Sequence, residues 1–367
     1  MKRTRENQGK TPVPISKQPH GLAHEELVIE VCRLFCLGRS PSDIAMEMNS
    51  QYGLTMTREQ PYKLLQYAAS SGLLRVVAPR EDYLSKKFDQ KFRWLSETVV
   101  VHTLRVEDVA EKAAEMLVRL LQERHRQKLS KTMHIGFPGG YAMWKVLEKF
   151  AELLLKEPME SLPEEVVFHH LVSGLDSELH QLNVGPFFLQ FQSEEGTQIR
   201  IRVRRCTAPS VIESELIERI LKQPLIEEAY NEVKVGKLDI ILTSGSDFED
   251  DDSIFREGYF NKDYLNRKEL INAGCVGDML WYPLSVNGPI KLDPHIYEYR
   301  TLALVDLHDL PSHIQSENHT HVLLVLGPCG GCGKLKTRIL DTILNLPKQY
   351  ITHLVVDSRT ARGLFEP

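Results

Sequence analysis

Apolar residues follow two different patterns along the chain. Between residues 24 and 71 they recur at helical spacing in three short segments, which predicts three helices. Beyond residue 97, continuous apolar runs such as 322–326 alternate with amphipathic segments of helical period. Runs of this length are typical of strands that are buried on both faces of a parallel sheet. The pattern therefore predicts an α/β protein with a helical head and a parallel-sheet body.

The head, residues 21–80, is predicted to be a winged helix-turn-helix. Helices are expected over 24–37, 43–48 and 57–71, and the apolar run 73–77 indicates a short strand. In this motif the third helix enters the major groove of DNA. Six residues of this helix are candidate DNA contacts, because their side chains can bind bases or phosphates. They are Thr57, Arg58, Gln60, Tyr62, Lys63 and Gln66. The alternative is a three-helix module that contacts another protein, because the turn before the third helix is long and Pro61 interrupts its start.

Two further segments flank the head. Residues 1–20 are polar and predict a disordered arm, whose basic residues either contact DNA phosphates or remain solvated. Residues 81–96 are predicted to form a linker helix with one apolar seam, which joins the head to the body and offers a surface for a dimer contact. The body is then expected to span residues 97–367.

Three junctions in the body join a buried strand to a glycine-containing turn. The run 322–326 leads into the loop 327–333, a helix over 334–346 and a second strand at 353–356. Such a unit places its loop at the carboxyl end of a strand, where backbone N–H groups and a helix N-terminus attract anions. We expect Lys334 to add a positive charge for a phosphate group.

The other two junctions lie earlier in the chain. A strand at 131–135 turns at Gly139 and Gly140 into a helix, which makes a second candidate anion site. A strand at 237–242 ends in the sequence Thr-Ser-Gly-Ser at 243–246, again at a carboxyl edge.

Charge and cysteine content narrow the class of protein. The 367 residues carry a net charge of −5, but residues 1–95 hold 15 Lys and Arg against 10 Asp and Glu. A basic head on an acidic body permits nucleic-acid binding by the head. The first residues lack the apolar core of a signal peptide, no apolar run reaches membrane-spanning length, and the six cysteines form no regular framework. These features predict a cytoplasmic protein with reduced thiols and no membrane partner.

Competing chemistry is present in two motifs. Cys329 and Cys332 have the spacing of a redox pair or of half a zinc site, but a zinc site needs further ligands, and Cys206 and Cys275 are isolated in the sequence. We therefore expect a phosphate loop here, with no metal and no cofactor. The acidic segment 247–252 matches no calcium-loop spacing, which favours a solvated loop.

The glycine junctions, taken in order, resemble the SorC family of sugar-binding transcriptional regulators. The resemblance covers most of the chain. The two most specific stretches are Ala-Gly-Cys-Val-Gly-Asp at 273–278 and the C-terminal signature, which combines Gly330, Gly331 and Lys334 with Leu-Val-Val-Asp-Ser-Arg-Thr-Ala at 354–361. Supporting stretches lie at 136–141, 208–209 and 238–246.

This resemblance implies a Rossmann-like body of the ribose-5-phosphate isomerase type. The body would bind a phosphorylated sugar without turnover and control the binding of the head to operator DNA. Family members are usually oligomers, so a homo-oligomer (dimer or tetramer) is expected. The positions that match the family's effector site are Gly139, Gly140, Tyr141, Gly245, Ser246, Asp278, Gly331 and Lys334.

Two other functions remain open at this point. One is a sugar-phosphate isomerase-like or deaminase-like enzyme with Asp278 as general base, and the other is a metabolite sensor that does not bind DNA. The simpler interpretation of Asp278 is a loop residue that caps backbone N–H groups or binds a sugar hydroxyl.

Besides the long turn and Pro61 in the head, the body departs from the family in three ways. The family usually has a hydroxyl residue after the first glycines, and Tyr141 occupies that position here, which puts this phosphate contact in question. A hairpin is predicted over 187–205 where the family tends to have a helix. The lysine of the family aligns with Lys334 only to within one or two residues, so Lys336 is an alternative to Lys334.

Overall fold

The computed structural model describes residues 24–128, 130–173, 199–209, 211–250 and 267–366. The chain divides into two units, Met1–Val77 and Ala78–Pro367, which are considered separately. The predicted arm at 1–20 and most of the predicted hairpin at 187–205 lie outside the described residues. No helix in the described part of the chain has both the length and the apolar character needed to cross a membrane.

The first unit contains the three predicted helices, α1 (His24–Cys36), α2 (Pro41–Tyr52) and α3 (Gln60–Ser71). Their apolar faces meet in one small core, in which Val28, Ile44 and Leu64 are fully buried. The helical spacing of these residues is what allows each helix to bury one face against the other two. The predicted three-helix head is therefore confirmed.

Local hydrogen bonds determine where these helices begin. The Ser40 hydroxyl accepts from the Asp43 N–H at 3.2 Å, and the Asp43 carboxylate accepts from the Ser40 N–H at 3.3 Å, which is a capping box. The third helix begins at Gln60 rather than at Thr57. The Gln60 side-chain oxygen accepts the Thr57 N–H at 2.6 Å, which holds the preceding residues in a turn.

The predicted wing of the head is wrong. Residues 73–77 form no strand in the structure. A strand needs a neighbour to satisfy its backbone groups, and none of the described strands pairs with this segment. Leu73, Val76 and Val77 are consequently exposed, Val76 by 88%, whereas Leu74 packs against the helical core.

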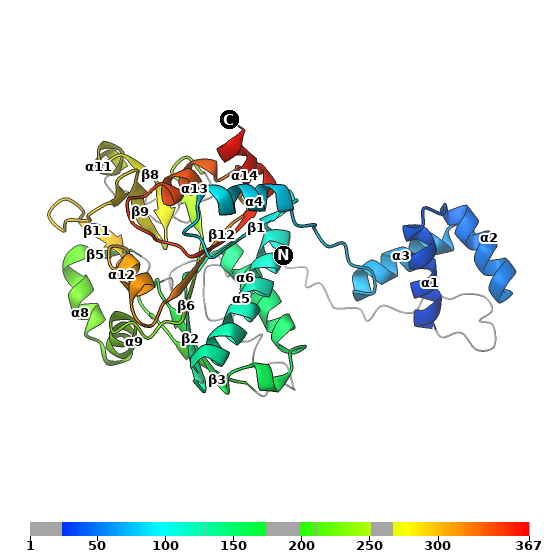
Figure 1. The fold of residues 1–367 in the computed structure, drawn as a ribbon, viewed down its shortest axis with the longest axis horizontal. Helices are drawn as coiled ribbons and strands as arrows, with labels where there is room; N and C mark the ends of the chain where they lie inside the picture. The colour runs from blue at the N-terminus through cyan, green and yellow to red at the C-terminus, as the bar shows by residue number, and fades with distance from the viewer. Residues whose placement is uncertain (1–23, 129, 174–198, 210, 251–266, 367) are drawn as a thin grey trace, which may run out of the picture. The chain divides into compact units, whose positions relative to one another are not determined.

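A seven-stranded parallel sheet forms the centre of the body, as predicted (Figure 1). Every neighbouring pair in this sheet is parallel. In spatial order the strands are β1 (Glu97–Val101), β13 (His353–Asp357), β12 (His321–Leu326), β6 (Ile240–Thr243), β2 (Thr132–Phe137), β3 (Glu165–His170) and β4 (Arg200–Arg204).

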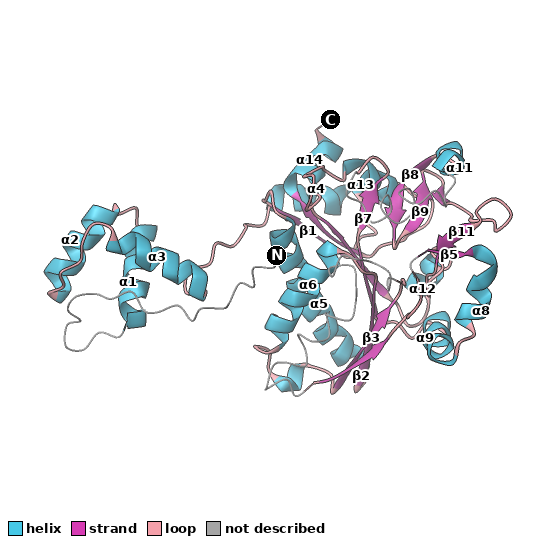
Figure 2. Cartoon of the chain, turned by 180° about the vertical axis from the view of Figure 1, so that it is seen from behind, coloured by secondary structure: helices cyan, strands magenta, loops and turns pink. Residues whose placement is uncertain are grey.

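Helices cover both faces of the sheet (Figure 2). Alternate residues of a strand face opposite sides, so Leu323 packs under α5 (Val106–Lys128) and α6 (Tyr141–Leu154), whereas Leu324 faces the other layer. That second layer contains α9 (Pro224–Lys234), α12 (Leu310–Gln315) and α13 (Thr337–Leu344). Burial on both faces explains the continuous apolar runs in the sequence.

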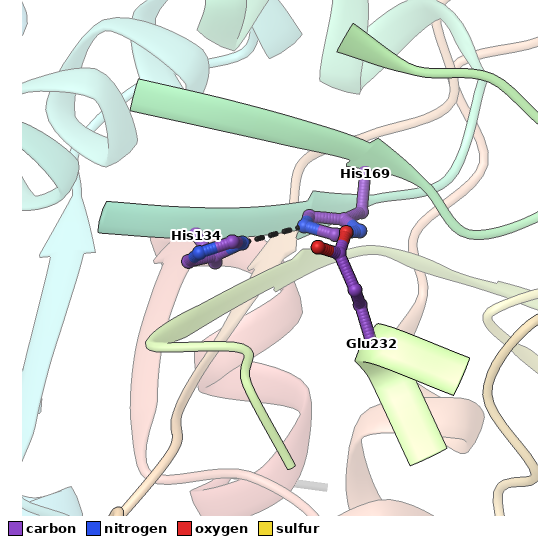
Figure 3. A group of neighbouring side chains, drawn as sticks. All are labelled: His134, His169 and Glu232. Carbon is purple, nitrogen blue, oxygen red and sulfur yellow. Dashed lines mark hydrogen bonds between the residues drawn. The ribbon is translucent and has the colours of Figure 1, made fainter. Parts of the chain in front are cut away.

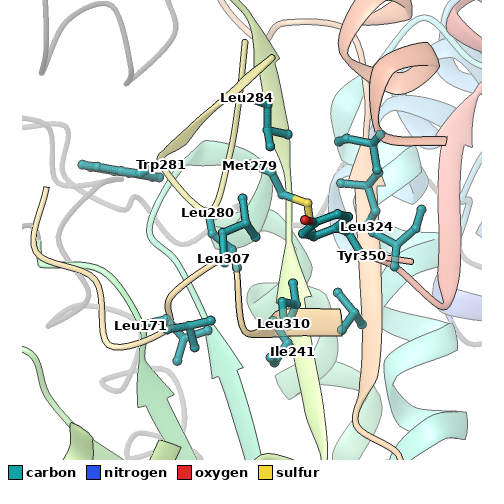
Figure 4. Packing of buried hydrophobic residues seen from close by; sticks show 14 of the residues in the cluster. Leu171, Ile241, Met279, Leu280, Trp281, Leu284, Leu307, Leu310, Leu324 and Tyr350 are labelled. Atoms are coloured by element: carbon teal, nitrogen blue, oxygen red, sulfur yellow. The ribbon is translucent and has the colours of Figure 1, made fainter. Parts of the chain in front are cut away.

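A smaller antiparallel sheet packs against the main sheet. Its strands, in order, are β10 (Gly288–Pro289), β9 (Tyr282–Ser285), β8 (Cys275–Met279) and β7 (Gly245–Asp247). Met279 and Leu284 join Ile241 and Leu324 of the main sheet in one buried cluster (Figure 4). The structure thus corrects the expectation that Asp278 is a loop residue, because it lies in β8.

The remaining elements complete the body. They are α8 (Ile217–Leu221), α11 (Arg267–Asn272), α14 (Ser358–Phe365), the pair of β5 (Val211–Glu213) and β11 (Tyr299–Thr301), and two 3-10 turns at Met159–Ser161 and Ser214–Leu216.

The predicted linker helix is part of the body. It forms α4 (Asp82–Lys91), and its apolar seam is buried rather than offered to a partner: Leu84 and Phe88 are at most 1% exposed. The Phe88 ring contacts Phe365 of α14 edge-on, with ring centroids 5.0 Å apart. The boundary between the units falls at Val77 instead, before this helix.

Candidate functional site

The order of the strands places a candidate site beside β2 and β6. From β2 the chain proceeds outward through β3 to β4, and from β6 it proceeds in the opposite direction through β12 to β13. Ligands of open α/β sheets bind outside the carboxyl ends of the strands at such a switch point. The loops that follow β2 and β12 contain the glycines selected in the sequence, and Gly245 opens β7, directly after β6.

The first loop contains Gly139 and Gly140 and leads into α6. Gly140 has a φ of 117°, a conformation that favours glycine. Tyr141, the first residue of α6, donates its hydroxyl to Glu107 at 2.8 Å. Burial and this hydrogen bond raise the pKa of Tyr141 to about 12. The hydroxyl therefore stays protonated, and its hydrogen bond goes to α5.

The first and third loops are in contact with each other. A Cβ atom on Gly330 would lie 3.0 Å from the Tyr141 ring, and one on Gly327 would lie 3.0 Å from the Val106 side chain. Such distances are tighter than ordinary van der Waals contact, so a larger residue at either position would have to displace its neighbour. The structure thus brings Tyr141 next to the loop that holds Gly331 and Lys334.

Gly245, Ser246 and Asp278 also come together. Ser246 of β7 pairs with Asp278 of β8, and its hydroxyl donates to the Asp278 carboxyl. The strands approach closely because both carry glycine: a Cβ on Gly245 would lie 2.7 Å from the Asp278 carbonyl oxygen, and one on Gly277 would lie 2.1 Å from that of Ser246.

Two carboxyls, of the buried Asp278 and the half-buried Asp247, lie near the start of α13. Burial raises the pKa of Asp278 to about 6, opposed by the hydrogen bond from Ser246 and by the charge of Lys336. Burial likewise raises the pKa of Asp247 to about 6, opposed by the Ile339 N–H, which it accepts at 2.6 Å, and again by Lys336. Asp247 is not among the site residues predicted from the sequence, because the segment 247–252 predicts a solvated acidic loop.

The third loop contributes the two candidate lysines. Lys334 is exposed, and its ammonium donates to the Glu249 carbonyl at 2.8 Å. Lys336 is half-buried and is the N-cap residue of α13. The positive charge of Lys336 acts to lower the pKa of both Asp247 and Asp278, so Lys336 lies near these two carboxyls. The sequence match selects Lys334 instead.

The candidate DNA contacts lie on the surface of the head. Thr57, Arg58, Tyr62 and Lys63 are exposed, whereas Gln60 is half-buried and uses its side-chain oxygen on Thr57. Residues 24–77 hold five Lys and Arg against six Asp and Glu. The basic excess of residues 1–95 therefore lies outside the three-helix unit.

A scan against protein-family models finds no match, and a search of curated proteins finds none either. Solved structures do share the fold, and it is the fold of SorC-type transcriptional regulators. The resemblance inferred from the sequence is thus confirmed at the level of the fold.

The similar structures include a full-length protein. The sorbitol operon regulator SorC from Klebsiella pneumoniae has a TM-score of 0.59 and 18% identity, over 94% of this chain and 100% of that chain. A DeoR family transcriptional regulator from Listeria monocytogenes has a TM-score of 0.54 and 19% identity, over 77% and 98%. A sugar-binding domain of a transcriptional repressor from Vibrio fischeri has a TM-score of 0.54 and 14% identity, over 78% and 98%.

Proposed function

We propose that this chain is a divergent SorC-type transcriptional regulator. Its head binds operator DNA, and its body binds a phosphorylated sugar or related metabolite that changes the affinity for DNA. The observation that carries this proposal is the similarity to full-length SorC, which extends over 94% of the chain and so includes both head and body.

The proposed effector site uses the three loops at the switch point. The glycine turn at Gly139 and Gly140 precedes the 14-residue helix α6, whose first N–H groups attract a phosphate. Lys336 and Lys334 supply positive charge from the third loop. Ser246 and Asp278 provide a hydroxyl and a carboxyl for sugar hydroxyl groups.

DNA recognition is assigned to the exposed surface at the start of α3. Arg58 and Lys63 supply the charge there, and Thr57, Tyr62 and Gln60 supply hydrogen-bonding groups. A homo-oligomer would present two heads to paired operator half-sites, which is why we expect a dimer or tetramer.

Fluorescence anisotropy on DNA from the upstream region of the gene tests the proposal. We expect saturable, salt-sensitive binding of the full chain, and we expect one sugar phosphate from a panel to shift the affinity. Binding no stronger than to random DNA would reject the assignment of the head. A melting temperature that no sugar phosphate raises would reject the effector site.

An enzyme that acts on a sugar phosphate is the second candidate. The observation that favours it is the burial of the Asp278 carboxyl beside Ser246, which raises its pKa to about 6, a value suited to a general base near neutral pH. Turnover of the bound sugar phosphate by the full chain would establish this reading, whereas binding without turnover would reject it.

A further inference from the structure

Three potential metal ligands converge at the carboxyl edge of the sheet. Cys329 and Cys332 lie in the loop after β12, and Asp250 lies in the segment after β7. Their two sulfur atoms and one carboxylate oxygen all lie within 4.8 Å of one another. The Cys332 thiol donates a hydrogen bond to Asp250 Oδ1 at 3.4 Å. The sequence shows Cys329 and Cys332 as half of a zinc site, and the structure adds a third potential ligand, Asp250, 82 positions before Cys332.

The backbone of the third loop brings the two thiols together. The Cys329 N–H donates to the Lys334 carbonyl at 2.9 Å, and the Gly333 N–H donates to the Cys329 carbonyl at 2.9 Å. Gly333 has a φ of 70°, which lets the chain reverse without a steric penalty. The loop therefore holds Cys329 and Cys332 at one end of a closed turn, as loops that bind metal through paired cysteines require.

Other contacts position Asp250 beside this turn. The Lys334 ammonium donates to the Glu249 carbonyl at 2.8 Å, and the Asp250 N–H donates to the Asp247 carbonyl at 3.0 Å. Asp250 is 2% exposed, whereas Cys332 is exposed. The three ligand atoms thus extend from a buried wall to the surface, which leaves a route by which an ion can enter.

The distance between Cys332 and Asp250 suits a tetrahedral cation. With a zinc–sulfur bond of about 2.3 Å and a zinc–oxygen bond of about 2.1 Å, a tetrahedral angle separates sulfur and oxygen by about 3.6 Å. The 3.4 Å between Cys332 and Asp250 is close to that value. Two thiolates and one carboxylate also favour Zn²⁺ over Mg²⁺ or Ca²⁺, which prefer oxygen ligands.

A second group, His134, His169 and Glu232, has a different geometry (Figure 3). His134 Nδ1 and His169 Nε2 are joined by a hydrogen bond of 2.8 Å, which is shorter than the roughly 3.3 Å between two nitrogen ligands of one zinc ion. Glu232 already accepts hydrogen bonds from Arg204 at 3.0 Å and from Lys237 at 3.3 Å. With this short nitrogen–nitrogen distance and these two ion pairs, the histidine group fits one zinc ion less well than the cysteine group does.

We propose that Cys329, Cys332 and Asp250 bind one thiophilic divalent cation, such as Zn²⁺, and leave its fourth coordination position open. Each thiol loses its proton to solvent when its sulfur binds the metal, and the carboxylate binds directly. The bound cation fixes the loop that also contains Gly331 and Lys334, so metal binding orders one side of the proposed effector site. The metal site itself does not depend on the proposed regulatory function.

Titration of the reduced, chelator-treated full chain with Co²⁺ tests this site. Cobalt bound by thiolate produces a sulfur-to-metal charge-transfer absorption that cobalt on carboxylates and imidazoles does not produce. We expect the band to saturate at one Co²⁺ per chain and to disappear when Zn²⁺ is added. Absence of the band at saturating Co²⁺ would overturn the proposal.

Variants identify the ligands. We expect Cys332→Ser and Asp250→Asn each to weaken Co²⁺ binding at least tenfold. The control is Cys36→Ser, which removes an exposed cysteine from the head and should leave the titration unchanged. Equal titrations of Cys332→Ser and the unsubstituted chain would overturn the assignment.

Two further measurements keep the result interpretable. Zn²⁺ should raise the melting temperature of the unsubstituted chain and of Cys36→Ser but not that of Cys332→Ser, which separates loss of the site from loss of the fold. Counting free thiols in the absence of reductant tests the redox alternative. A Cys329–Cys332 disulfide, together with no cobalt band after its reduction, would establish a redox pair and reject the metal site.

Discussion

The Ser246 hydroxyl donates a hydrogen bond to the Asp278 carboxyl across the β7–β8 pair. Asp278 is only 6% exposed, so this bond replaces water as the partner of a buried acid. Burial nonetheless outweighs the bond, because the pKa of Asp278 rises to about 6. The ionised form is therefore less stable in the folded chain than in water.

This imbalance predicts how Asp278→Asn changes the dependence of stability on pH. A carboxyl in an unfolded chain titrates near pH 4, about two units below the folded value. Between these values the folded state binds more protons, so the free energy of unfolding falls as the pH rises through this window. Asparagine keeps an oxygen for Ser246 but cannot ionise. Over this pH window, the free energy of unfolding of Asp278→Asn, measured with urea, should therefore fall by about 2–3 kcal/mol less than that of the unsubstituted chain.

Asp89→Asn provides the control for this measurement, because Asp89 is exposed on α4. Its pH profile should follow that of the unsubstituted chain. Burial also raises the pKa of Asp247 to about 6, so Asp247 should lower the free energy of unfolding over the same pH window in all three proteins. Parallel profiles for Asp278→Asn and the unsubstituted chain would contradict the prediction.

A second prediction separates the two lysines of the third loop. Lys336 lies near the carboxyls of Asp247 and Asp278, whereas the Lys334 ammonium donates to the Glu249 carbonyl. A charged hydrogen bond to phosphate contributes about 1.5–3 kcal/mol, so Lys336→Met should weaken binding of a sugar phosphate about 10–100-fold. Lys334→Met should have a smaller effect. Isothermal titration of both variants checks the order.

The unphosphorylated sugar is the control for this comparison. Its affinity should be similar in the two variants, because the lost interaction is with the phosphate. A larger loss in Lys334→Met than in Lys336→Met would instead assign the phosphate contact to Lys334, as the sequence match suggests.

The parts of the fold that the sequence predicted are those with a local signal. The runs at β12 and β13 are apolar throughout because both faces of these strands are buried, and the glycine turns follow strands directly. The wing was mispredicted for the opposite reason. Residues 73–77 are apolar, but a strand also needs a partner, and pairing is not a property of the segment itself.

Long-range relationships account for what the sequence could not show. Asp250 meets Cys332 only because the segment after β7 lies against the loop after β12, 82 positions away. Asp278 was read as a loop residue because β8 contains Gly277 and has no polar–apolar alternation. All five residues of that strand are buried, so the usual period of two is absent.

The third prediction concerns Gly277 and the packing of strands β7 and β8 in the smaller sheet. A Cβ at this position would lie 2.1 Å from the Ser246 carbonyl oxygen and 3.1 Å from the Ile339 side chain. Because the nearest atom is backbone, Gly277→Ala must push β7 away from β8 and disturb Asp278. We expect a loss of more than about 3 kcal/mol in the free energy of unfolding, measured with urea.

Gly274→Ala is the matched variant for this experiment. A Cβ on Gly274 would meet nothing within 4 Å, and only the φ of 72° opposes it. Its cost should be about 1 kcal/mol. If the two variants were equally stable, the close approach of β7 and β8 would not constrain the strand.

The last prediction concerns the source of salt-dependent DNA binding. The three-helix unit has five basic and six acidic residues, whereas residues 1–23 hold five basic residues and one acidic residue. Each phosphate neutralised on duplex DNA contributes about 0.9 to the slope of log affinity against log salt. Replacing the five basic residues of the arm by glutamine should therefore reduce the slope by up to about 4.5; these are Lys2, Arg3, Arg5, Lys10 and Lys17. Arg58→Gln should instead weaken operator binding by about 1–3 kcal/mol and change the slope by at most about 1. Anisotropy at several salt concentrations distinguishes the two effects, and an unchanged slope in the glutamine variant would show that the arm makes no phosphate contacts.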